Sequence, residues 1–156
     1  MDTDIYLGID TGKHLGWCLG THSRYILSGR YKRASWSGLY EFLDRLIDEY
    51  GVSFLCYEEV AMGVHKKWAD DYGRHLGILA LLSESNDIPL GCMHVTTLKR
   101  LVSGSGRGDK DAVRAGVCSY YGLGSDVFRS YDESDACGVL VSHFKDDRYM
   151  KWKGGI

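Results

Sequence analysis

The sequence predicts an α/β protein with a mixed five-stranded sheet, its first three strands antiparallel, flanked by helices. Short β-prone runs crowd into the first third of the 156 residues, helical periodicity follows them, and two later apolar runs lie between predicted helices. Strands reached through helical crossovers join a sheet in parallel. We expect a single domain over residues 1–156, because no long linker or internal repeat divides the chain.

The first three strands are predicted from alternation and turn chemistry. In residues 5–10, apolar side chains at the odd positions alternate with other residues up to the turn Thr11-Gly12. Residues 16–19 and 25–31 supply two more short strands, separated by a turn-rich segment over residues 20–23. Connections this short predict an antiparallel meander.

Residues 39–50 carry apolar side chains at helical spacing, with Ser37 as the expected N-cap and Gly51 as the stop. The apolar run over residues 53–60 predicts a buried central strand. The remaining elements are expected, in chain order, as a helix over 65–83, a strand over 90–95, helices over 97–102 and 109–121, and a last helix over 132–145.

Composition limits the class of protein. Nineteen basic and 21 acidic side chains give a net charge of −2, yet no acid lies between Thr11 and Tyr40, where several basic residues do. A basic face for a polyanion is one interpretation of this segment, and an ordinary solvated surface is the other. Five scattered cysteines without a CxxC pair predict reduced thiols in a cytoplasmic protein, and no apolar run predicts a membrane span.

Acids fall at the ends of two predicted strands. Asp10 closes the first strand, at the edge where open α/β sheets bind ligands, although an acid there is also common in turns. Glu58 and Glu59 end the central strand, and consecutive strand residues face opposite sides. One of them therefore shares a face with Asp10, and an acid in an apolar run needs a partner, either a basic side chain or a metal ion.

A second pair of acids lies where the last helix begins. Asp132 and Asp135 are three residues apart and share one face of that helix. Taken alone, the pair is typical of helix capping. If these acids converged with those of the strands, a cation would be needed to offset their repulsion. Oxygen ligands suit Mg²⁺ or Mn²⁺, and two such ions can support phosphodiester cleavage.

These motifs resemble a known family. Ile9-Asp10-Thr11-Gly12, Tyr57-Glu58-Glu59-Val60 and Asp132-Glu133-Ser134-Asp135-Ala136 are similar to the three acidic motifs of RuvC-type Holliday junction resolvases, in the RNase H-like superfamily. The similarity covers most of the chain. The low net charge suggests a divergent member, with a viral origin as one possibility.

The resemblance implies an RNase H-like fold, a homodimer, and paired metal-dependent nicks in four-way or other branched DNA during recombination and repair. It makes Asp10, Glu58, Asp132 and Asp135 the ligands of two Mg²⁺ ions, with Mn²⁺ as a substitute, and excludes Glu59. Lys99 and Lys110 match catalytic basic residues near the scissile phosphate. The side chains that we expect to contact DNA are Lys13, Lys66, Lys67, Arg74, Lys99, Arg100, Arg107 and Lys110.

The sequence departs from the family at Ala61, where better-known members carry a large aromatic residue that wedges into the junction. Met62 or Trp68 could replace it, although a tryptophan at this position is more typical of a core residue. Gly73 and Gly77 would permit close helix packing, either in a dimer or on the protein's own sheet.

Three other functions compete with junction resolution. Another RNase H-like nuclease would cut RNA or RNA/DNA hybrids, and a non-catalytic protein would only bind junctions. The turn Asp10-Thr11-Gly12 also resembles that of actin-like and sugar-kinase ATPases, but 156 residues are too few for their two lobes.

Overall fold

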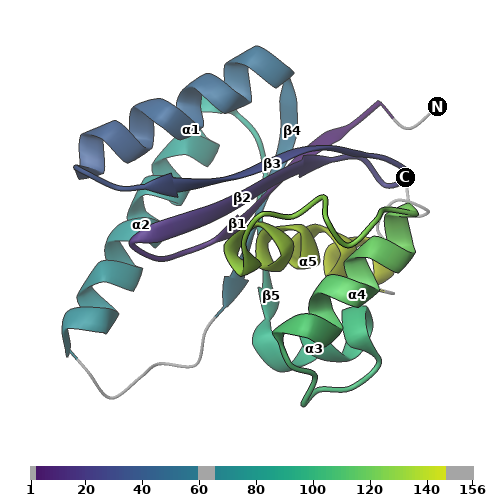
Figure 1. Cartoon of the computed structure of the whole chain (residues 1–156). Helices are drawn as coiled ribbons and strands as arrows, with labels where there is room; N and C mark the ends of the chain where they lie inside the picture. Colours follow the sequence, from purple (N-terminus) through teal and green to yellow (C-terminus); the bar gives the residue numbers. More distant parts are fainter. Residues whose placement is uncertain (1–2, 60–65, 147–156) are drawn as a thin grey trace.

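The central strand of the sheet is the first one in the chain. The computed structural model describes residues 3–59 and 66–146, and its strand order is β3-β2-β1-β4-β5. β1 pairs antiparallel with β2 and parallel with β4, so the predicted mixed five-stranded sheet is confirmed. The strands are β1 (Ile5–Asp10), β2 (His14–Gly20), β3 (Tyr25–Lys32), β4 (Val52–Glu59) and β5 (Leu90–His94) (Figure 1).

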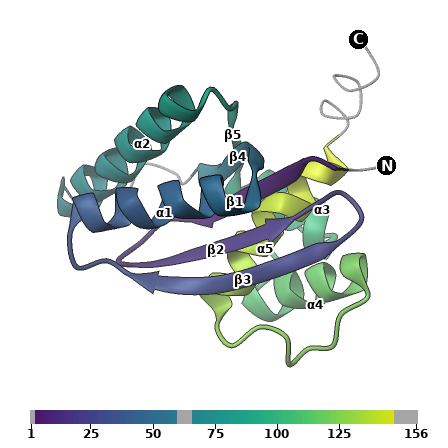
Figure 2. The same ribbon diagram turned by 90° about the horizontal axis from the view of Figure 1, so that it is seen from above.

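Helices cover both faces of this sheet. One group of helices packs on each face, as the view from above in Figure 2 shows. None of the helices within the described ranges is long and apolar enough to cross a membrane. The first face carries α1 (Trp36–Tyr50) and α2 (Lys66–Asn86), and the second carries α3 (Val95–Ser103), α4 (Lys110–Tyr121) and α5 (Tyr131–Lys145).

Two cores result, one on each side of the sheet. Leu7 and Ile9 of β1 pack with the buried leucines of α1 and α2, whereas Tyr6 packs with α5. Side chains on both faces of β1 are therefore buried, because helices enclose both faces of this central strand.

The boundaries of some elements differ from the predicted ones. The N-cap of α1 is Ser35 rather than Ser37, since the Ser35 hydroxyl accepts a hydrogen bond from the amide of Gly38. The prediction of Ser37 was wrong because Trp36 already lies in the helix. Gly51 ends α1 in the left-handed conformation, as predicted. α3 begins two residues earlier than expected, because His94 caps it by accepting from the amide of Thr96.

α5 lies unusually close to the sheet. A β-carbon on Gly16 would clash with the backbone carbonyl of Asp132, and one on Gly8 would clash with that of Ala136. These two glycines of β1 and β2 therefore let the helix backbone rest directly on the strands. Gly16 pairs with Asp10 across the sheet, so the contact brings the start of α5 to the carboxyl end of β1.

We expect Gly16→Ala to lower the free energy of unfolding by about 1–3 kcal/mol, because α5 must move away from β2 to make room for the methyl group. Gly12→Ala, in the turn after β1, is the control. A β-carbon there would lie 3.5 Å from the backbone oxygen of His14, an ordinary contact, so we expect little change in stability. Urea unfolding of both variants measures the difference, and equal stabilities would contradict the close contact.

Candidate active site

Three of the predicted acids line one cleft. The cleft has a volume of about 210 Å³, and its walls include Asp10, Glu58 and Asp135 together with Lys99 and Lys110. The register that pairs Ile9 with Tyr57 places Asp10 beside Glu58 on neighbouring parallel strands. Asp135 reaches the same cleft from the first turns of α5, so residues from three distant parts of the sequence meet there.

Glu58, rather than Glu59, shares the cleft with Asp10. Glu59 is exposed at the end of β4, where it pairs in register with His94 of β5. This division follows from the alternation of side chains along a strand.

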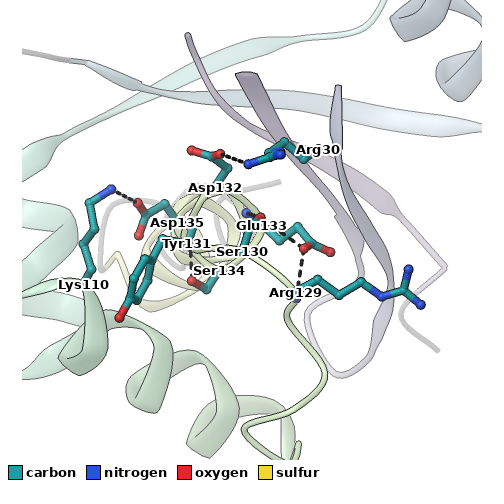
Figure 3. Close-up of polar contacts among 9 residues, drawn as sticks. All are labelled: Arg30, Lys110, Arg129, Ser130, Tyr131, Asp132, Glu133, Ser134 and Asp135. Carbon is teal, nitrogen blue, oxygen red and sulfur yellow. Dashed lines mark hydrogen bonds and ion pairs between the residues drawn. The ribbon is translucent and has the colours of Figure 1, made fainter. Parts of the chain in front are cut away.

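Asp132 lies beside the cleft instead of lining it. Its carboxylate forms an ion pair with the Arg30 guanidinium at 3.8 Å, whereas that of Asp135 accepts a hydrogen bond from Lys110 at 3.2 Å. Figure 3 shows the two aspartates near the start of α5, with Lys110 and Arg30 on opposite sides of it. The four acids thus form a group of three in the cleft and a neighbour at its edge.

The capping interpretation of Asp132 is wrong. Ser130 is the N-cap of α5, and its hydroxyl accepts from the amide of Glu133. The carboxylate of Glu133 in turn accepts from the Ser130 hydroxyl and from the amide of Arg129. Because this reciprocal pair caps the helix, Asp132 and Asp135 are left to act elsewhere.

The carboxylates in the cleft destabilise one another's charged forms. Burial raises the pKa of Asp10 well above its usual value, and Asp135, Glu58 and Asp132 raise it further. Burial and then the charge of Asp135 raise the pKa of Glu58, against the lowering effects of Lys99, Lys110 and His94. Burial also raises the pKa of Asp135, although Lys110 opposes that shift.

Lys110 supplies positive charge to the cleft. Burial lowers its pKa, but the carboxylates of Asp135, Asp10 and Asp132 outweigh this effect, so the pKa is raised and the ammonium form is favoured. Even with Lys110 and Lys99 present, the three acids keep raised pKa values. Burial is the largest cause of each raised pKa, and the lysines do not cancel it.

The donor set fits a hard divalent cation. Three carboxylates in one cleft offer the oxygen ligands that Mg²⁺ and Mn²⁺ prefer, and a cation would relieve their repulsion. Within residues 3–59 and 66–146, no three His, Cys, Asp or Glu side chains form a ready-made metal site. A metal ion would therefore have to draw these carboxylates together as it binds.

Predicted DNA-contacting residues are spread over several elements. Lys13 lines a smaller hollow of about 100 Å³ with Trp68 and Tyr72, whose rings are stacked with centroids 5.5 Å apart. Trp68 is 37% exposed, so it is not a core residue. At the start of α2, Lys66 and Lys67 are exposed, and further along the helix Arg74 forms an ion pair with Asp71. Arg100, in the last turn of α3, and Arg107, in the loop after it, are also exposed. Ala61 and Met62 lie outside the described residues.

Some polar neighbours of the cleft were missed by the sequence analysis. Asp109 lines it and caps α4 by accepting from the amide of Ala112 at 2.8 Å. Arg30, which holds Asp132, lies on β3, far from the acidic motifs in sequence. The acid-free segment around Arg30 was a signal for it, but no local motif connected it to the acids.

Similarity to known proteins extends along the whole chain. The crossover junction endodeoxyribonuclease RuvC of Shewanella sediminis is 26% identical over 162 residues, covering 97% of this chain and 92% of that protein. The protein of the same name from Cytophaga hutchinsonii is 27% identical, covering 97% and 82%. No protein-family model matches the chain.

Solved structures agree in fold. RuvC of Thermus thermophilus in complex with a Holliday junction substrate superposes with a TM-score of 0.83 at 18% identity, covering 97% of this chain and 96% of that one. The chain is RuvC-like. The yeast mitochondrial Holliday junction resolvase Ydc2 is a more distant neighbour, with a TM-score of 0.65 at 14% identity and coverage of 98% and 80%. The RuvC resemblance and the RNase H-like fold that the acidic motifs predicted are thereby confirmed.

In this RuvC-like protein, Asp10→Asn should stabilise the fold when divalent metal is absent. Folding holds the Asp10 carboxyl at a raised pKa, so at neutral pH its charge costs stability, and this cost disappears as the pH falls through the raised pKa towards 3.8. At pH 7 in EDTA we expect a Tm higher by a few degrees, an advantage that shrinks as the pH falls.

Differential scanning fluorimetry from pH 7 downwards measures this effect. Asp48→Asn, which changes an exposed aspartate of α1, is the matched control and should leave Tm unchanged. A lower Tm for Asp10→Asn at pH 7 would show that the carboxylate stabilises the fold.

Proposed function

We propose that the protein is a Mg²⁺-dependent endodeoxyribonuclease that resolves four-way or other branched DNA by paired nicks. One observation carries the proposal: Asp10, Glu58 and Asp135 converge with Lys99 and Lys110 in a single cleft of a RuvC-like fold. The names of the relatives, which are crossover junction endodeoxyribonucleases, support the same reaction.

Each side chain of the cleft has a role in this proposal. Asp10, Glu58 and Asp135 hold the metal, with Asp132 as the neighbouring acid that completes the set. When bound, two Mg²⁺ ions would supply the charge that activates water and stabilises the departing 3′ oxygen, and Mn²⁺ can substitute. Lys110 and Lys99 offset the negative charge that gathers on the non-bridging phosphate oxygens.

Lys110 is held in position before DNA arrives. Its ammonium lies 3.2 Å from a carboxylate oxygen of Asp135, and its side chain is 63% exposed. Asp135 is only 16% exposed, but the lysine reaches solvent, so its ammonium can turn from the carboxylate to a phosphate, which is also a charged acceptor. The displaced Asp135 is then available to the metal.

Two nicks in one junction require two active sites, and we infer that a homodimer supplies them. The β-carbons that Gly73 and Gly77 lack would meet open space, so these residues do not serve close packing of α2 on the protein's own sheet. On the same helix Leu81 is 52% exposed. Small residues beside an exposed leucine suit a close contact with a second copy of α2.

Cleavage of a strand-labelled four-way junction tests the function. We expect paired nicks with Mg²⁺ and none in EDTA. Glu58→Gln and Asp135→Asn should each lower the rate by more than about 10³-fold, and Lys110→Ala by about 10²–10³-fold, the loss typical of removing one charge-stabilising donor.

The control variant Asp48→Asn should cut at the rate of the unaltered protein. Cleavage of hybrids or RNA in preference to junctions would replace the proposal with another RNase H-like nuclease activity. Junction binding without any Mg²⁺-dependent cutting would show that the protein binds junctions but does not cleave them.

Leu81→Asp should shift the protein from dimer to monomer, because two charges would be buried at the α2 contact. Sedimentation equilibrium measures the mass of each species. Leu27→Asp, which changes a 40% exposed leucine on β3, is the matched control and should remain dimeric. A monomeric unaltered protein would contradict the inferred dimer.

A further inference from the structure

A groove beside the cleft is separate from the active site described above. It has a volume of about 530 Å³ and lies between β3 and residues 127–130, the segment that leads into α5. Two cations, Arg30 and Arg129, are exposed among its lining residues, with the hydroxyls of Ser28 and Ser130 beside them. The basic residues predicted from the sequence to contact DNA do not include either arginine.

Glu133 is the acid of this groove, and its carboxylate already has partners. It is only 6% exposed, and one oxygen accepts from the Ser28 hydroxyl at 3.2 Å. The other accepts from the Arg129 amide at 3.0 Å and from the Ser130 hydroxyl at 3.1 Å. Since Glu133 is buried and hydrogen-bonded as part of the helix cap, the exposed charges of the groove are the two guanidinium groups.

The groove is aligned with the active site by the register of the sheet. Asp10 pairs with Gly16, and Gly16 pairs with Arg30, so the three positions form one row across β1, β2 and β3. The backbone of Asp132 passes directly over Gly16 in the middle of this row. Asp132 therefore lies between the acids of the cleft and Arg30, and Figure 3 shows its carboxylate directed towards Arg30.

We propose that this groove binds a backbone phosphate of the DNA substrate through Arg30 and Arg129, and that the phosphate replaces Asp132 as the partner of Arg30. The inference rests on the proposed function and adds a second contact for the same substrate. Arg30 is two strand spacings, about 10 Å, from Asp10, so a strand cut in the cleft carries a nearby phosphate within reach of the groove.

Replacing Asp132 by a phosphate as the partner of Arg30 costs little free energy. The Arg30–Asp132 pair spans 3.8 Å, and the Arg30 side chain is 50% exposed, so solvent already screens the attraction. A phosphate can accept two hydrogen bonds from one guanidinium, whereas the contact with Asp132 is a single approach at 3.8 Å, longer than a hydrogen bond. Once released, Asp132 lies next to the carboxylates of the cleft, where it raises the negative charge that attracts the metal. Binding of DNA thus assembles the fourth acid at the site.

Binding of a fluorescent four-way junction in EDTA tests the groove without any cleavage. Arg129→Gln should weaken binding about tenfold and lower the slope of log K against log salt concentration by about one, as expected for the loss of one phosphate contact. Arg24→Gln is the matched control. It changes an exposed arginine at the start of β3, at the opposite end of the sheet, and should leave both quantities unchanged.

An unchanged affinity and salt slope for Arg129→Gln would overturn the groove as a phosphate site. Cleavage assays on the same proteins separate this outcome from a failure of the proposed function. If the unaltered protein cuts junctions while Arg129→Gln binds normally, only the groove is wrong. If binding depends on Arg129 but no junction is cut with Mg²⁺, the groove stands and the nuclease proposal fails.

A Mn²⁺ titration without DNA tests the exchange itself. Arg30→Gln removes the partner of Asp132 and should tighten Mn²⁺ binding severalfold, measured by the loss of the free-ion electron paramagnetic resonance signal. Arg129→Gln, which does not touch Asp132, should bind Mn²⁺ as the unaltered protein does. Equal Mn²⁺ affinity for Arg30→Gln and the unaltered protein would overturn the exchange.

Discussion

The close approach of α5 to the sheet is the constraint on which the site depends. Because Gly8 and Gly16 lack side chains, the backbone of α5 rests on β1 and β2 at the end where Asp10 lies. A helix separated from the sheet by ordinary side chains would lie roughly 10 Å away, the usual distance between packed layers, and its aspartates would not reach the strand acids. Two glycines that carry no chemistry therefore determine where the chemistry can occur.

The part of the site that strands build was predictable from the sequence. Side chains alternate along a strand, and parallel neighbours end at the same edge, so one of Glu58 and Glu59 could be placed with Asp10. The resemblance to the resolvase family then selected Glu58. The sheet itself followed from short apolar runs and turn residues for the same reason. These are local patterns, and local patterns survive in a single sequence.

The parts of the site that depend on contacts between segments distant in sequence were not predictable. Asp132 and Asp135 share a helix face, yet one lines the cleft and the other pairs with Arg30, because β3 lies on one side of α5 and α4 on the other. Capping stayed an alternative role for Asp132 for a similar reason: the sequence has several acids near the helix start, and only the backbone geometry shows that Ser130 and Glu133 take that role. The N-cap of α1 was misplaced by two residues through the same ambiguity between nearby serines.

Acidic and basic side chains occupy separate places on the molecule, so the net charge of −2 says little about how a local surface would interact with DNA. Acids gather at the carboxyl ends of β1 and β4, while cations stand on the elements on either side: Lys110 on α4, and Arg30 on β3. Lys110 is paired with Asp135, which lines the cleft, and Arg30 with Asp132, which lies beside it. A phosphate that binds either cation competes for it with the carboxylate and leaves that carboxylate without its partner. The repulsion among the acids then increases, and a divalent cation becomes the group that relieves it. Under the proposed function, substrate and metal would therefore favour each other's binding.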